Sequence, residues 1–290
     1  MNIRRIIGIL LLGCTVLLAS LFFYGLFFGP LFAYSPIKQG FDELALDRCT
    51  IIYPKGTELP PEYKTVDDLM AETEQFHRLQ FKKRVQIIVC ASNGQHKRFS
   101  LGGGHACTAQ TGTVIYFRPS IGETTYPPGL SIEGGNIKLL SPSVDGYRKL
   151  TDFLKHELSH AILYQNTSLL KALRIKTWLE EGLAVYFGNS DHYYRGEDLK
   201  TLAIDQNFFF DLFDDEIEPE NIPFEIKHTF RYGFFQGFIV YLIDAYGFDT
   251  VIGFVHKYIQ APKEEAVLFK ESFGITQQEA LDIFRQRLRE

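Results

Sequence analysis

The chain has 290 residues, of which 46% are hydrophobic and 22% are charged, a composition that indicates a folded globular protein and excludes a disordered one. The formal net charge is −5, and beyond the apolar first 34 residues, whose only charges are Arg4 and Arg5, 28 basic side chains stand against 35 acidic ones. This acidic balance excludes nucleic acid as a partner, and it gives the domain no overall attraction to an anionic membrane surface.

The N-terminal segment predicts a membrane anchor. Residues 6–34 carry no charge, and this run is longer than the roughly 20 apolar residues that a membrane-spanning helix needs. A cleaved signal peptide is the alternative, although its apolar core usually has only about 7 to 15 residues. Because Arg4 and Arg5 precede the run, we expect a short cytoplasmic tail within 1–34 and an extracytoplasmic remainder, periplasmic or on the outer surface in a bacterium.

Residues 35–142 are expected to form a β-rich lobe. Short β-branched runs bounded by turn residues predict strands, and the acidic start and recurring apolar positions of 65–81 predict an amphipathic helix. The last predicted strand lies just before the helix that carries the histidine motif described below. We expect it to present an exposed edge that holds an extended substrate by backbone hydrogen bonds. The predicted strands are 49–53, 85–90, 112–117 and 136–140.

Three cysteines lie outside the anchor, namely Cys49, Cys90 and Cys107. In an oxidising compartment they allow one disulfide, for which Cys90 and Cys107 are the expected pair, because one ends an apolar run and the other follows a glycine-rich loop. Buried free thiols are the alternative.

Residues 143–290 are expected to form a helical lobe, because apolar residues recur there at helical spacing. No internal repeat and no long flexible linker separates the two halves. The sequence therefore predicts an α+β fold in which 35–290 is one domain of two packed lobes. The predicted helices are 145–165, 177–188, 229–246, 248–259 and 276–289.

The first of these helices contains His156-Glu157-Leu158-Ser159-His160. Histidines four residues apart lie on the same helix face, so their imidazoles can bind a single zinc ion. Glu157 is turned about 100° around the helix axis from His156, too far to be a natural ligand but able to reach the attacking water. It is therefore the candidate general base. The alternative interpretation is a metal-free helix whose histidines pack or face solvent.

The next helical stretch begins with Trp178-Leu179-Glu180-Glu181-Gly182-Leu183-Ala184. A catalytic zinc site needs a third protein ligand and one open position. An HExxH motif followed by Trp-Leu-x-Glu-Gly-x-Ala resembles the gluzincin metallopeptidases, including the peptidase MA-like domains. In that family the Glu before Gly is the third zinc ligand, so the resemblance implies Glu181. Glu180 is then a charged residue that complements the dipole at the helix start.

A peptidase also needs a hydrogen-bond donor for the negative charge that develops on the carbonyl oxygen in the transition state. The run from Tyr232 to Leu242 resembles the segment of zinc aminopeptidases that bears their catalytic Tyr, which implies Tyr232 for this role. The alternatives are that Tyr232 is a packing residue and that Arg231 or His228 is the donor. Tyr186, one turn beyond Glu181, is a further candidate.

The resemblance covers roughly residues 80–290, and it implies a zincin-type helical lobe, a Zn²⁺ cofactor and a peptide or protein substrate. The expected function is the hydrolysis of peptide bonds by a membrane-anchored zinc peptidase. The chain lacks the Gly-x-Met-Glu-Asn run that anchors a free amino terminus in zinc aminopeptidases, so cleavage from the chain end is not implied. A catalytically silent, membrane-tethered binding or assembly protein with a structural zinc is the alternative. The sequence leaves the oligomeric state open.

Overall fold

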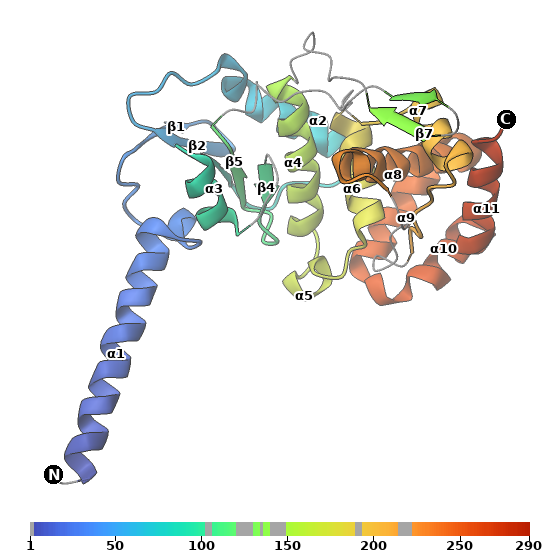
Figure 1. Cartoon of the computed structure of the whole chain (residues 1–290). Coiled ribbons are helices and arrows are strands. Elements are labelled where there is room, and N and C mark those ends of the chain that lie inside the picture. The colour runs from blue at the N-terminus through green and yellow to red at the C-terminus, as the bar shows by residue number, and fades with distance from the viewer. Residues whose placement is uncertain are drawn as a thin grey trace.

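The structure, a computed structural model, describes residues 3–101, 106–119, 130–133, 136–139, 149–188, 193–213 and 222–290. A long helix, α1, projects from a domain in which a β-sheet lies beside a larger group of helices (Figure 1). The α+β class expected from the sequence is confirmed. The zincin-type arrangement of two lobes stays a prediction.

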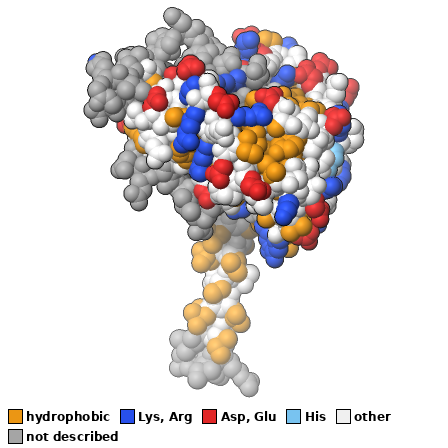
Figure 2. Space-filling model, turned by 90° about the vertical axis from the view of Figure 1, so that its right-hand side faces the viewer, with side chains coloured by type: hydrophobic (Ala, Val, Ile, Leu, Met, Phe, Trp, Pro, Cys, Tyr) orange, Lys and Arg blue, Asp and Glu red, His pale blue; other side chains and the backbone are white. Residues whose placement is uncertain are grey.

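Helix α1 (Ile3–Phe28) is long and apolar enough to cross a membrane, with 7–28 as the candidate span. Over the part of α1 whose side chains are described, residues 7–28, Figure 2 shows hydrophobic side chains and no acidic or basic ones, whereas the domain surface mixes both charges. The helix ends before Gly29-Pro30, earlier than the expected limit at residue 34. The short helix η1 (Phe32–Tyr34) follows, and there Phe32 and Ala33 are buried in the domain.

The main sheet has five strands in the order β1-β2-β3-β5-β4. Its centre is parallel, and the two edge strands run antiparallel to their neighbours. Three of the four predicted strands are confirmed here as β2, β3 and β5, while β1 and β4 were not predicted. The strands are β1 (Phe41–Ala45), β2 (Cys49–Pro54), β3 (Val85–Val89), β4 (Ala106–Thr108) and β5 (Val114–Phe117).

Both faces of this sheet are covered. Helices α2 (Val66–His77) and α4 (Leu150–Gln165) contribute to an apolar cluster with side chains of one sheet face. Helix α3 (Asn93–Ser100) and η1 form a second cluster on the other face, in which the Phe32 and Phe99 rings stack with centroids 4.4 Å apart. Parallel strands that are buried on both faces have continuous apolar sequences, so the central strands could be predicted from the sequence.

The fourth predicted strand is confirmed as β7 (Asn136–Leu139), and its expected role as the edge that holds a substrate stays a prediction. It pairs with β6 (Leu130–Glu133) in a separate two-stranded sheet. Figure 1 shows this hairpin beside α7 (Gly196–Lys200), and Leu130 packs on the helical core. The sheet edge that lies against α4 is β4 instead.

The helical part surrounds a core rich in aromatic side chains. Helices α6 and α8 pack closely at Gly182, where a Cβ atom would lie 2.8 Å from Ile239 Cγ1 and 2.9 Å from the Phe235 carbonyl oxygen. All five predicted helices of this part are found. The helix predicted at 177–188 has the same ends in the structure, and residues 145–148 of the first predicted helix lie outside the described residues. The other three differ from their predicted ends by up to five residues. The remaining helices are α5 (Leu169–Ala172), α6 (Thr177–Gly188), the π-helix η4 (Thr201–Asp205), α8 (Phe224–Tyr246), α9 (Phe248–Gln260), α10 (Glu265–Phe273) and α11 (Gln277–Arg287), with short 3-10 turns η2 (Pro61–Thr65) and η5 (Pro262–Glu264).

The cysteines are free thiols in this structure, so the expected pair of Cys90 and Cys107 is not formed. Cys49 and Cys90 are buried, and burial raises the pKa of each thiol to about 12. These thiols therefore behave as small apolar core groups, which is the alternative that the sequence left open.

Candidate metal centre

Helix α4 presents both histidines of the motif on one face. The two imidazole centroids are 4.9 Å apart, and the two Nε2 atoms are separated by 3.2 Å. His156 and His160 are both buried, because this face of α4 packs against α6. The spacing of four residues and the burial of α4 together aim two ring nitrogens at one point.

Helix α6 brings the Glu181 carboxylate to the same point. Its Oε2 lies 3.1 Å from Nε2 of His156 and 3.4 Å from Nε2 of His160. Ligand atoms about 2.0–2.1 Å from a single tetrahedral zinc ion are about 3.3–3.4 Å from one another. The donor set and its spacing therefore fit a zinc ion, and within the described residues these three form the one such group of histidines, cysteines and carboxylates.

The charges around the cluster also suit a cation. Burial by itself would raise the pKa of Glu181, but the two imidazoles hold that pKa well below its usual value. Burial likewise lowers the pKa of His160, whereas Glu181, Glu180 and Glu157 together raise it to about 9. One carboxylate, that of Glu181, thus faces the two imidazoles in a buried space, with the negative charges of Glu157 and Glu180 nearby, and this arrangement attracts positive charge.

No family model matches the chain, and no curated protein matches it. What the site can do is therefore inferred from its own residues.

The Glu157 carboxylate faces the sheet. Its Oε2 accepts a hydrogen bond from Thr108 Oγ1 at 2.6 Å, and the same hydroxyl lies 3.0 Å from the Glu157 carbonyl oxygen. Thr108 is the last residue of β4, so the edge strand fixes the carboxylate next to the first histidine. Thr108 was not predicted as a site residue, because 49 residues of sequence separate it from its partner.

Tyr232 on α8 also reaches the cluster. Its hydroxyl donates a hydrogen bond to Glu181 Oε1 at 2.9 Å. Burial, and then the Glu181 carboxylate, raise the pKa of Tyr232 well above its usual value, so the hydroxyl keeps its proton and remains a donor. The ring of His228 lies 4.3 Å from that of Tyr232, and the Arg231 guanidinium lies over the Phe235 ring.

Glu180 is placed apart from the three candidate ligands. Its Oε2 accepts a hydrogen bond from the Tyr164 hydroxyl at 2.8 Å, and the Tyr164 ring stacks on His160 with centroids 6.0 Å apart. Glu180 thus supports the ring of a candidate ligand through Tyr164, while Glu181 faces both imidazoles.

Two further histidines, His77 and His256, connect the helices α2 and α9 to α4. His77, the last residue of α2, shares a hydrogen bond of 2.8 Å between its Nε2 and Ser159 Oγ, and His256 Nε2 donates to the His77 carbonyl oxygen at 2.8 Å. Complete burial, with smaller effects from His160 and His256, lowers the pKa of His77 to about 3. His77 is therefore a neutral group that ties α2 and α9 to the motif helix.

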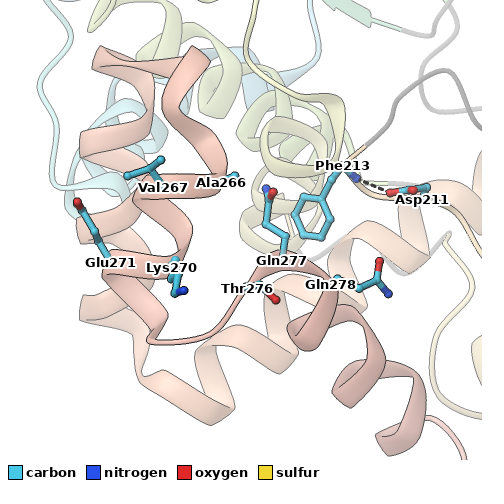
Figure 3. A pocket seen from close by; sticks show the side chains of 9 residues that line it. All are labelled: Asp211, Phe213, Ala266, Val267, Lys270, Glu271, Thr276, Gln277 and Gln278. Atoms are coloured by element: carbon cyan, nitrogen blue, oxygen red, sulfur yellow. Dashed lines mark hydrogen bonds between the residues drawn. The ribbon is translucent and has the colours of Figure 1, made fainter.

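Two surface hollows lie apart from the cluster. One of about 650 Å³ lies beside α10 and α11, where Figure 3 shows Phe213 and Gln277 close together and Asp211 bonded to the Phe213 backbone. The other, of about 670 Å³, is lined by Tyr53, Val89 and neighbouring residues at the ends of β2 and β3. Neither is lined by a predicted site residue, so neither is assigned to the substrate.

Proposed function

We propose that this protein is a membrane-anchored zinc peptidase in which His156, His160 and Glu181 hold the metal. The observation that carries this proposal is the convergence of three ligand atoms, from two helices, at separations that fit one tetrahedral ion. The position of Glu157, one residue after the first ligand, adds the acid-base group that hydrolysis needs.

Bound zinc would polarise the carbonyl of the scissile peptide bond and lower the pKa of the attacking water to about 7. Glu157 accepts the proton of that water as the new C–O bond forms. It then returns the proton to the leaving amine as the C–N bond breaks, so the carboxylate ends the cycle as it began. Thr108 keeps the carboxylate oriented during both transfers, because its hydroxyl donates to Oε2.

Tyr232 is the proposed donor to the carbonyl oxygen in the transition state. The hydroxyl has one proton, and in this structure that proton is directed at Glu181 Oε1. Tyr232 thus orients the carboxylate before reaction and can turn to the developing oxyanion as the substrate binds. This assignment favours Tyr232 over Arg231, whose guanidinium lies over aromatic rings.

The proposed substrate is an extended peptide that lies along β4. This strand is at the edge of the main sheet, and its last residue holds Glu157. A peptide that pairs with an edge strand gains backbone hydrogen bonds without regard to its sequence. Such pairing would place a peptide bond next to the catalytic carboxylate.

A test compares three variants of the full-length chain reconstituted in lipid nanodiscs. Glu157→Gln should keep stoichiometric zinc and lose cleavage of a peptide library, while Glu181→Gln should lose both. Glu271→Gln, an exposed change on α10, should match the wild type. Zinc is quantified in the same samples that are assayed.

Two outcomes would reject the peptidase. Stoichiometric zinc, with Glu157→Gln indistinguishable from the wild type in every cleavage assay, would favour the membrane-tethered binding or assembly protein with a structural zinc. A wild-type chain without zinc would favour the metal-free helix.

A further inference from the structure

The short helix α5 carries an exposed apolar surface that the proposed peptidase reaction does not use. Leu169, Leu170 and Leu173 are 52%, 72% and 61% exposed. Leucines at this exposure are unremarkable singly, but these three lie within five successive residues, in α5 and directly after it, so that one short segment exposes several apolar side chains.

This patch is held in place by the rest of the fold. Ala172 and Ile175 of the same segment are buried, so the chain here has an inner and an outer apolar side. The Lys176 backbone N–H donates to the Tyr258 hydroxyl at 2.9 Å, and the Gln260 side chain donates to the Asn166 carbonyl oxygen at 2.7 Å. These two bonds attach the chain to α9 at Asn166 and at Lys176, on either side of α5. The three exposed leucines between them are therefore directed away from the domain.

Basic side chains accompany the leucines. Residues 168–176 contain Lys171, Arg174 and Lys176 and no acidic residue, in a chain whose overall charge is −5. Leucines flanked by lysine and arginine are the composition of segments that lie in the interface of an anionic bilayer. The positive charge of this segment therefore favours contact with an anionic membrane surface, although the net charge of the domain does not.

The position of α5 agrees with this composition. Figure 1 shows α5 at the edge of the domain on the side from which α1 projects. The chain that follows α1 is anchored in the domain, because Phe32 and Ala33 of η1 are buried in the sheet cluster. Lys38 Nζ also donates to the carbonyl oxygens of Phe32, Ala33 and Ser35, each at 2.8 Å. A membrane crossed by α1 would thus meet the α5 face of the domain.

We propose that Leu169, Leu170 and Leu173 insert into the interface of the same bilayer that α1 crosses, with the neighbouring basic side chains on anionic lipid headgroups. This proposal rests on the proposed membrane span of α1 and is independent of the zinc chemistry. The domain then has two attachment points on the membrane, which fix its orientation instead of leaving it to rotate about a single tether.

The test uses the full-length chain in nanodiscs that contain anionic lipids with brominated acyl chains, which quench nearby tryptophan. One tryptophan is added at a time, as Leu170→Trp in α5, Leu10→Trp in α1 and Lys64→Trp in η2. Lys64 is exposed, and η2 lies at the opposite edge of the domain from α1 in Figure 1. The native Trp178 is buried and gives the same background in every variant.

We expect the brominated lipids to quench the fluorescence of the tryptophans added at positions 10 and 170. The tryptophan at position 64 should keep its fluorescence. Quenching at 10 without quenching at 170 would overturn the second contact and leave the anchor intact. That outcome would assign the leucines to a protein partner instead. Absence of quenching at both positions would overturn the anchor and the α5 contact together, and neither outcome bears on zinc binding.

Discussion

At the scale of single residues, the carboxylate that carries protons in the proposed reaction is oriented by one hydroxyl. We predict that Thr108→Val lowers kcat about tenfold, because loss of a hydrogen bond to a charged catalytic group costs on the order of 1.5 kcal/mol. Zinc content should not change, since this hydroxyl bonds Glu157 and not the candidate ligands. Steady-state kinetics with metal quantification check both points. Thr108→Ser keeps the hydroxyl and is expected to restore kcat, whereas a fully active Thr108→Val would show that Thr108 has no role.

His77 gives the protein a predicted acid sensitivity. Its pKa is about 3 when folded and about 6.5 when unfolded, so the unfolded state binds the extra proton between these values. Neutral His77 makes its full contribution to the free energy of unfolding above pH 6.5. This contribution is lost as the pH falls toward 3, by about 1.4 kcal/mol per pH unit. We predict that the urea midpoint of His77→Gln falls less than that of the wild type between pH 7 and pH 5. Equal falls in the two proteins would disprove the assignment.

At the scale of elements, the contact between α6 and α8 determines where Glu181 lies. We predict that Gly182→Ala destabilises the fold by about 1–3 kcal/mol and weakens zinc binding, because the added Cβ would overlap Ile239 and the Phe235 carbonyl and push α6 away. Gly253→Ala in α9 is the matched control. Its Cβ would meet nothing within 4 Å, so we expect a gain of about 0.5–1 kcal/mol. Urea unfolding and zinc titration of both variants measure the difference, and equal stability of the two would contradict the close packing.

The elements also show what the sequence can and cannot predict. Helices and central strands were predicted because their signals are local: helical periodicity in 177–188 and β-branched runs such as 85–89. Strand β1 contains Asp42 and Glu43, and β4 has three residues, so neither has a clear apolar pattern. The two histidines followed from a spacing within one helix, and Glu181 from a family resemblance. Thr108 and His77 reach the site only through tertiary contacts, which no local pattern reveals.

At the scale of the whole molecule, α4 joins two cores. Leu158 and Ala161 pack in the cluster with the sheet, whereas Leu163 and Tyr164 belong to the core of the helical part. Two of the three candidate ligands lie along the same helix, and the third comes from α6 in the helical core. A metal ion at this point would therefore link α4, which belongs to both cores, to α6 in the helical core. Its binding should stabilise both cores together.

Removal of the metal tests this connection. We predict that chelation lowers the melting temperature of the full-length protein by on the order of 10 °C, because a ligand present at 1,000 times its Kd stabilises the folded state by about 4 kcal/mol. The loss should occur in one transition recorded by differential scanning calorimetry, since α4 belongs to both cores. Glu181→Gln lacks one ligand, so its lower melting temperature should not respond to the chelator. A wild-type melting temperature that chelation does not move would mean that the three side chains meet for structural reasons alone.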